Sequence, residues 1–346
     1  FREFLRAHMK TWINDENNRK PDGSKYNLNT DGLKIYTTIN YSMQEMAENA
    51  VTSHMPRLQK EFFEQNETLD DSIAPFRELT SGAVDTLLRV SMRRSERWRK
   101  MKYDLKKNDE EIEESFYIPK EMTVFSWAGE IDTTMTPLDS MKYYKSFFRP
   151  GMMSMDPTNG YIKAWVGGMN YRHFQYDMVK KGKRQIGSTF KPFVYAAAID
   201  QLKLSPCDTF PDSQFCIEKN KFGNVEQWCP KNSGDKYGRT RTLKNALANS
   251  VNTITARLMD RIGPRTVVKL AKDLGIEQRI LPVPSIALGT PDLSVYEMVA
   301  AYSTFANKGV YTQPVFIERI DDKNGTTLYK NQPVTRDVLS EEAAYV

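Results

Sequence analysis

The sequence predicts an α+β fold in which an antiparallel sheet is flanked by helices, with a smaller N-terminal linker domain. Two hairpin patterns support the sheet, because strand-like runs surround turn residues at 156–160 and again at 322–325. The second hairpin is expected to pair residues 311–320 with 326–329. Strands at both ends with helices between them are typical of α+β layers rather than of a doubly wound sheet. The helical segments expected in between are 188–202, 243–248, 253–262, 265–274 and 294–307.

The N-terminal part has a strand, a helix and a charged stretch. Residues 33–39 alternate as a strand does, and a helical pattern follows from Ser42. From 53 to 121 the chain is heavily charged, and residues 89–114 mix both signs along an apparently helical run. Such mixing is usual for a solvated helix face, and nucleic-acid binding is the disfavoured alternative.

A change of composition near Pro150 suggests the domain boundaries. We expect a leading helix and linker at 1–30, a linker region with a strand and charged helices at 31–149, and the main domain at 150–346. The chain begins without Met inside a helical pattern and stops where another helix starts, so we expect it to be an excised piece. An export signal or membrane anchor could then lie upstream.

The composition is that of an ordinary folded domain and excludes few classes of function. Of the 346 residues, 40% are hydrophobic, enough to bury a core without disulfides or metals. A balance of 49 Lys+Arg against 44 Asp+Glu gives a formal charge of +5, too small to indicate nucleic acid by itself. No stretch approaches the roughly 20 apolar residues that cross a bilayer.

The three cysteines lie in one loop-rich stretch, at Cys207, Cys216 and Cys229, and no histidine is near them. A structural zinc site needs four nitrogen or sulfur ligands, so we expect neither a metal nor a cofactor here. Cys216 and Cys229 flank residues 217–228, which have a hairpin pattern, so their side chains could face each other. They are either an oxidised pair, which would leave Cys207 free, or small buried hydrophobes.

A candidate nucleophile lies where a loop turns into a helix. Ser188 is followed three positions later by Lys191, and residues at this spacing share one helix face. The helix dipole favours a nascent alkoxide on Ser188, and Lys191 could take its proton if burial lowers the pKa of the lysine. A second Ser-x-x-Lys at Ser233–Lys236 has a turn composition that does not readily open a helix, so we discard it.

A second candidate element is Ser250-Val-Asn252, between two helical segments. Alone, these residues could merely cap the next helix. Because they follow the first motif and have further matches around them in the resemblance described below, they become candidate site residues. A Ser-His-Asp site with His173 and Asp177 is disfavoured, because no Gly-x-Ser-x-Gly turn is present.

These motifs together resemble those of the penicillin-binding transpeptidases, in particular the bifunctional class A synthases. The likeness extends from about Leu33 to the end of the chain, and the first dozen residues resemble the tail of the glycosyltransferase domain that precedes this module in class A proteins. The matching segments are 164–168, 184–192, 246–252, 284–289 and 301–307.

The resemblance implies a β-lactamase/transpeptidase-like fold and a D,D-transpeptidase that cross-links peptidoglycan stem peptides through an acyl-serine. Its catalytic residues would be Ser188, Lys191, Ser250 and Asn252. Stem peptides of lipid II-derived glycan strands and β-lactam antibiotics would be its partners. The full-length protein would be anchored in the cytoplasmic membrane with this module on the periplasmic side. A D,D-carboxypeptidase or β-lactamase, a β-lactam sensor and a noncatalytic wall-binding module are the alternatives.

The third motif of the family, Lys-Thr-Gly, does not occur in the 346 residues. Residues 323–327, Lys-Asn-Gly-Thr-Thr, are a decoy within a hairpin turn. We therefore expect the motif beyond Val346, and the chain without it to be impaired.

Overall fold

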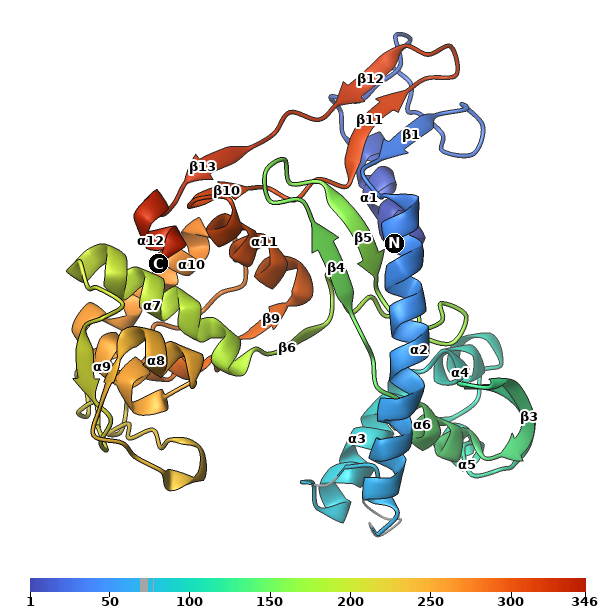
Figure 1. Ribbon diagram of the computed structural model, residues 1–346. Helices are drawn as coiled ribbons and strands as arrows, with labels where there is room; N and C mark the ends of the chain where they lie inside the picture. The colour runs from blue at the N-terminus through green and yellow to red at the C-terminus, as the bar shows by residue number, and fades with distance from the viewer. Residues whose placement is uncertain (69–73, 77) are drawn as a thin grey trace. The chain divides into compact units, whose positions relative to one another are not determined.

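The computed structural model describes residues 1–68, 74–76 and 78–346, and divides into two compact units (Figure 1). The first unit contains residues 1–47, 151–167 and 176–346, and the second contains 48–150 and 168–175. Residues 69–73 and 77, part of the charged region 53–121, lie outside the described residues. Helices and antiparallel strand pairs make up the described chain, which confirms the predicted α+β class.

An antiparallel sheet in the first unit joins the N-terminal segment to the C-terminal hairpin (Figure 1). Met9 packs with Ile317 and Ile320 in a small apolar core beneath this sheet. The Thr38 hydroxyl also donates to the carbonyls of Ile162 and Val315, at 2.8 Å each. The elements are α1 (Arg2–Asn14), β1 (Lys34–Thr37), β11 (Ile317–Asp321) and β12 (Thr327–Lys330).

The expected strand 311–320 is wrong as one element, because it is divided into β10 (Val310–Thr312) and β11. Pro314 has no N–H to donate and interrupts the ladder between them. Around it the chain changes partners: Gln313 donates its N–H to Val334, and Val315 donates to Gly160. The strand β13 (Thr335–Asp337) then pairs with β10.

The first predicted hairpin is confirmed as β4 (Met152–Met155) and β5 (Ile162–Val166). Its turn requires Gly160, which has φ +75° and whose added Cβ would lie 2.3 Å from the Gln313 carbonyl oxygen. Trp165 on β5 is buried and stacks on Phe4 with ring centroids 4.5 Å apart. This hairpin is thereby fixed against α1.

The helices of the first unit enclose a large apolar core to which α7 (Lys191–Leu202) and α9 (Asn252–Ile262) contribute most. Phe193, Ala198, Ile254 and Leu258 are completely buried there. The helices predicted between residues 188 and 307 start and end within two residues of their predicted bounds, except that 187–190 form a 3-10 turn instead of the first turn of α7. The helices are α7 (Lys191–Leu202), α8 (Leu243–Ala248), α9 (Asn252–Ile262), α10 (Pro264–Asp273), α11 (Val295–Ala306) and α12 (Glu341–Tyr345). Short strand pairs link them: β6 (Lys183–Gln185) with β9 (Asp292–Ser294), and β7 (Thr209–Pro211) with β8 (Thr240–Thr242).

The second unit shows that the charged run 89–114 is not one helix. Ser95 and Asn108 both have extended backbones, and each caps the helix that follows it, Ser95 by accepting from the Trp98 N–H at 3.1 Å. Met92, Trp98, Ile112 and Phe116 form a buried cluster beneath the charged faces. The elements are α2 (Tyr41–Asn66, which begins in the first unit), α3 (Ser81–Arg94), α4 (Glu96–Arg99), the π-helical turn η1 (Lys100–Asp104), α5 (Asp109–Glu114), β2 (Lys120–Ser126), β3 (Gly129–Met135) and α6 (Pro137–Lys145). Among the described residues, every helix is too short or too polar to span a bilayer.

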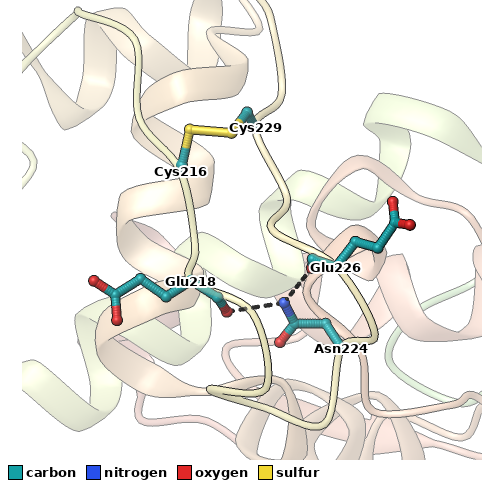
Figure 2. The surroundings of a disulfide bond; sticks show 5 residues. All are labelled: Cys216, Glu218, Asn224, Glu226 and Cys229. Atoms are coloured by element: carbon teal, nitrogen blue, oxygen red, sulfur yellow. Dashed lines mark hydrogen bonds between the residues drawn. A yellow bond between two sulfur atoms is a disulfide. The ribbon is translucent and has the colours of Figure 1, made fainter.

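A disulfide joins Cys216 and Cys229, while Cys207 is free and exposed, which confirms the oxidised pairing (Figure 2). The hairpin expected between the two cysteines forms only an isolated β-bridge and no full strands. In this bridge Ile217 and Trp228 exchange two backbone hydrogen bonds of 2.9 Å. Within the loop, the Asn224 side chain donates to the carbonyl oxygens of Glu218 and Glu226, at 2.9 and 2.7 Å (Figure 2). The loop is closed both covalently and by these hydrogen bonds.

Candidate active site

Ser188 lies in the 3-10 turn η2 (Gly187–Phe190), immediately before α7, with its side chain exposed. Two glycines fix this turn against η4 (Pro284–Leu288): Gly187 donates its N–H to the Gly289 carbonyl at 2.9 Å. A Cβ on Gly289 would lie 1.8 Å from the Gly187 carbonyl oxygen, so no side chain fits there. The segment 284–289, which carried part of the family resemblance, therefore acts as the backbone support of the candidate nucleophile.

Further contacts hold the flanks of the turn. Ile186 donates its N–H to the Pro291 carbonyl at 3.2 Å, next to the pairing of β6 with β9. On the other flank, the Tyr302 hydroxyl donates to the Thr189 carbonyl at 2.6 Å. Phe190 is completely buried and meets Phe193 edge to face. Ser188 is thus an exposed hydroxyl on a turn that is anchored on both sides.

Lys191, the first residue of α7, is only 1% exposed. Its ammonium donates to the Ser250 carbonyl at 2.6 Å, to the Ser250 hydroxyl at 3.0 Å and to Asn252 Oδ1 at 2.6 Å. None of these acceptors is a carboxylate, so the amine is hydrogen-bonded without a counter-charge. Desolvation by burial lowers the pKa of Lys191 to about 8, which makes a neutral amine accessible near physiological pH.

Ser250 occupies a position at which a helix usually ends in glycine. Its φ is +52°, and the N–H groups of Ser250 and Val251 donate to Leu247 and Ala246, the pattern of a Schellman turn after α8. A non-glycine residue in this conformation costs about 1 kcal/mol or more. The turn directs both the carbonyl and the hydroxyl of Ser250 at Lys191.

Asn252 begins α9 and has both ends of its amide engaged. Its Oδ1 accepts from Lys191, and its Nδ2 donates to the Lys231 carbonyl at 2.7 Å. The structure therefore brings together three of the four residues singled out in the sequence. The Ser188 hydroxyl makes no hydrogen bond to any residue that the structure describes, although the Lys191 N–H donates to the Ser188 carbonyl.

Sequence reasoning missed Asn232, whose side chain accepts from the backbone N–H groups of Asn252 and Thr253 at 3.0 and 3.2 Å. These residues are 20 and 21 positions away along the chain. A local pattern cannot reveal such a contact.

The arrangement suits acyl transfer by a serine. An exposed hydroxyl beside a helix start can attack a carbonyl, and a buried amine of lowered pKa can take up its proton. No group of three or more potential metal ligands occurs among the described residues.

Comparisons with known proteins place the chain in a family. A model of the penicillin-binding protein middle domain matches residues 71–148, and a model of the penicillin-binding protein transpeptidase domain matches residues 150–344. The second match covers more than half of the chain, which therefore belongs to the penicillin-binding proteins and contains their transpeptidase domain.

The similar proteins include several that are named Penicillin-binding protein 1A. The chain is 36% identical over 190 residues to Penicillin-binding protein 1A of Aquifex aeolicus, covering 54% of this chain and 25% of that protein. It is 36% identical over 197 residues to Penicillin-binding protein 2D of Bacillus subtilis, covering 57% of this chain and 28% of that protein. The chain thus spans about a quarter of the length of these relatives.

Solved structures support the fold. The crystal structure of Penicillin-Binding Protein 1A from Haemophilus influenzae matches 96% of this chain and 50% of its own, with a TM-score of 0.61 and 22% identity. The penicillin-binding protein PonA1 from Mycobacterium tuberculosis matches 90% of this chain and 61% of its own, with a TM-score of 0.55 and 19% identity.

Proposed function

We propose that the protein is a D,D-transpeptidase that cross-links peptidoglycan stem peptides through an acyl-enzyme on Ser188. The observation that carries this proposal is the buried Lys191 amine, 2.6 Å from Asn252 Oδ1 and 3.0 Å from the Ser250 hydroxyl, one helical turn after an exposed serine. Burial of a lysine ammonium without a carboxylate costs desolvation free energy, whereas a general base gains from it the lowered pKa that it needs.

Acylation would begin with transfer of the Ser188 hydroxyl proton to the neutral Lys191 amine. The Ser188 oxygen then attacks the carbonyl between the two terminal D-alanines of a donor stem peptide, with the Ser188 N–H as one oxyanion donor. The peptide C–N bond breaks, and the departing D-alanine amine receives its proton from Lys191 through the Ser250 hydroxyl. Asn252 holds the donor amide and the lysine.

Deacylation would reverse these proton transfers. The amine of a second stem peptide loses a proton to the site and attacks the acyl-serine, which forms the cross-link and returns Ser188 to its hydroxyl form. A β-lactam would acylate the same oxygen and remain attached. Because the chain spans about a quarter of the length of the relatives named above, the experiments below use the full-length protein.

In the cell, this module would act at the periplasmic face of the cytoplasmic membrane, on glycan strands derived from lipid II. The family resemblance carried by residues 184–192 and 246–252 implies this placement.

Turnover of a synthetic donor tests the proposal. With a stem peptide ending in D-Ala-D-Ala and a labelled primary amine, we expect released D-alanine together with labelled, cross-linked product, and neither with Ser188→Ala. Release of D-alanine without incorporation of the amine would instead define a carboxypeptidase. A stable acyl-serine without any turnover would define a sensor.

The acylation rate should rise with pH. With the pKa of Lys191 lowered to about 8 by burial, the neutral amine is the minor form at pH 6 and half of the population at pH 8. The rate of penicillin acylation should therefore increase about 50-fold from pH 6 to pH 8 and level off above pH 9, as expected for a general base. Stopped-flow measurement with a chromogenic β-lactam tests this, and a flat profile would contradict the role of Lys191.

A further inference from the structure

The start of α9 has no capping side chain of its own. The residue before the helix is Val251, which has no hydrogen-bonding group, and it makes no side-chain cap. The N–H groups of Asn252 and Thr253 would remain unsatisfied without an external acceptor, and such groups are usually paired. Asn232 Oδ1 supplies that acceptor for both groups, at 3.0 and 3.2 Å.

Asn232 is itself held by a buried carboxylate. Asp212 has no exposed surface, and its Oδ1 accepts from the Asn232 side-chain amide at 2.7 Å and from the Thr253 hydroxyl at 2.9 Å. Its Oδ2 accepts from Arg241 at 2.7 Å and from the Gly238 N–H at 3.0 Å. Burial alone would raise the pKa of Asp212, but these four hydrogen bonds together hold it below its usual value, so the group is a charged anchor.

The same segment fixes the orientation of the Asn252 amide. The neighbouring Lys231 carbonyl accepts from Asn252 Nδ2 at 2.7 Å, which leaves Oδ1 directed at the Lys191 amine. A rotated amide would present an N–H to the ammonium, two donors facing each other. Cys229, two residues before Lys231, is tied to Cys216 by the disulfide, so this segment is also restrained covalently.

We propose that Asn232, held by the buried carboxylate of Asp212, is a positioning residue that sets the place of Asn252 and, through it, of the Lys191 amine. The chain of contacts runs from Asp212 to Asn232, from Asn232 to the start of α9, and from Asn252 to Lys191. Asn232 touches none of the reacting atoms. This inference rests on the proposed acylation of Ser188.

The test compares the rates at which a labelled penicillin acylates variants of the full-length protein. Each rate is normalised to the amount of protein that is labelled at the end of the reaction, so that inactive molecules do not affect it. Asn232→Ala should slow acylation about 10- to 100-fold, because displacement of a catalytic group by about 1 Å can cost 10²-fold. Two variants of Thr253 test the role of Asp212. Thr253→Val loses the hydrogen bond to Asp212 and should slow acylation. Thr253→Ser keeps the hydroxyl and should acylate at the wild-type rate.

Lys221→Met is the control for stability, because it breaks the 2.6 Å ion pair of the disulfide loop with Asp260 on α9 without touching the start of that helix. It should lower Tm slightly and leave the acylation rate unchanged. Folded Asn232→Ala with the wild-type rate would overturn the proposal; if that variant does not fold, equal rates for Thr253→Val and Thr253→Ser would overturn it. Failure of the wild type itself to acylate Ser188 would instead reject the proposed function.

Discussion

Replacing Ser188 by alanine should abolish covalent labelling by penicillin while the protein remains folded. The side chain is exposed and makes no hydrogen bond to a described residue, so its removal leaves no buried group unsatisfied. The turn around it is fixed by other contacts, including the Gly187–Gly289 hydrogen bond of 2.9 Å. With no oxygen to attack the β-lactam carbonyl, the acyl-enzyme cannot form, and a gel or mass assay with labelled penicillin should show no adduct.

Ser233→Ala is the matched control, because Ser233 is the first residue of the other Ser-x-x-Lys in the chain and lies in a separate 3-10 turn. It should label at the wild-type rate. An adduct that persists in Ser188→Ala, or that disappears in Ser233→Ala, would contradict the assignment of the nucleophile.

Replacing Lys191 by alanine should slow acylation by about 10²- to 10⁴-fold, the usual contribution of a general base. The site would lose its proton acceptor, while Ser188 would stay in place because its turn does not depend on the lysine side chain. Lys191→Met keeps much of the aliphatic stem that fills the buried space, and it should be slowed to a similar extent. Rates from labelled penicillin, with circular dichroism to confirm folding, provide the measurement.

Lys203→Ala is the control at the other end of α7, where the lysine is exposed. It should acylate at the wild-type rate. Wild-type acylation by a folded Lys191→Ala or Lys191→Met would exclude this lysine as the base.

Local patterns predicted the elements that are determined by neighbouring residues. The hairpin of β4 and β5 was predicted because Asp156 to Gly160 form a turn through contacts among themselves, such as the 3.0 Å bond from the Thr158 N–H to Asp156. The helix α8 was predicted from apolar residues at helical spacing, and in the structure Thr242 caps its start. The disulfide was one of the two alternatives that the sequence left open for Cys216 and Cys229, and it was foreseeable because these cysteines flank one short loop.

The errors arise where a local signal competes with a stronger constraint. The charged run 89–114 has helical periodicity, but Ser95 and Asn108 interrupt it and cap the helices that follow them. Ser and Asn side chains bond to nearby backbone groups, which favours helix caps over helix interiors. The turn at Ser188 was expected to be α-helical, but it is a 3-10 turn whose backbone is bonded to Gly289 far along the chain.

The interior of the candidate site depends on distant contacts that no motif contains. Ser250 could be taken for a helix cap in the sequence, whereas it adopts a left-handed backbone after α8 that directs its carbonyl at Lys191. The cap of α9 is supplied by Asn232, 20 positions away from Asn252. A sequence can therefore indicate which residues react, but the residues that position them become visible only when the chain is folded.

The most direct measurement of the central claim is the mass of the full-length protein after exposure to a penicillin, followed by mapping of the modified peptide. The account predicts a single penicilloyl adduct on the peptide that contains Ser188, formed faster at pH 8 than at pH 6. An adduct on any other residue, or an unchanged mass in a folded protein after prolonged exposure, would contradict it.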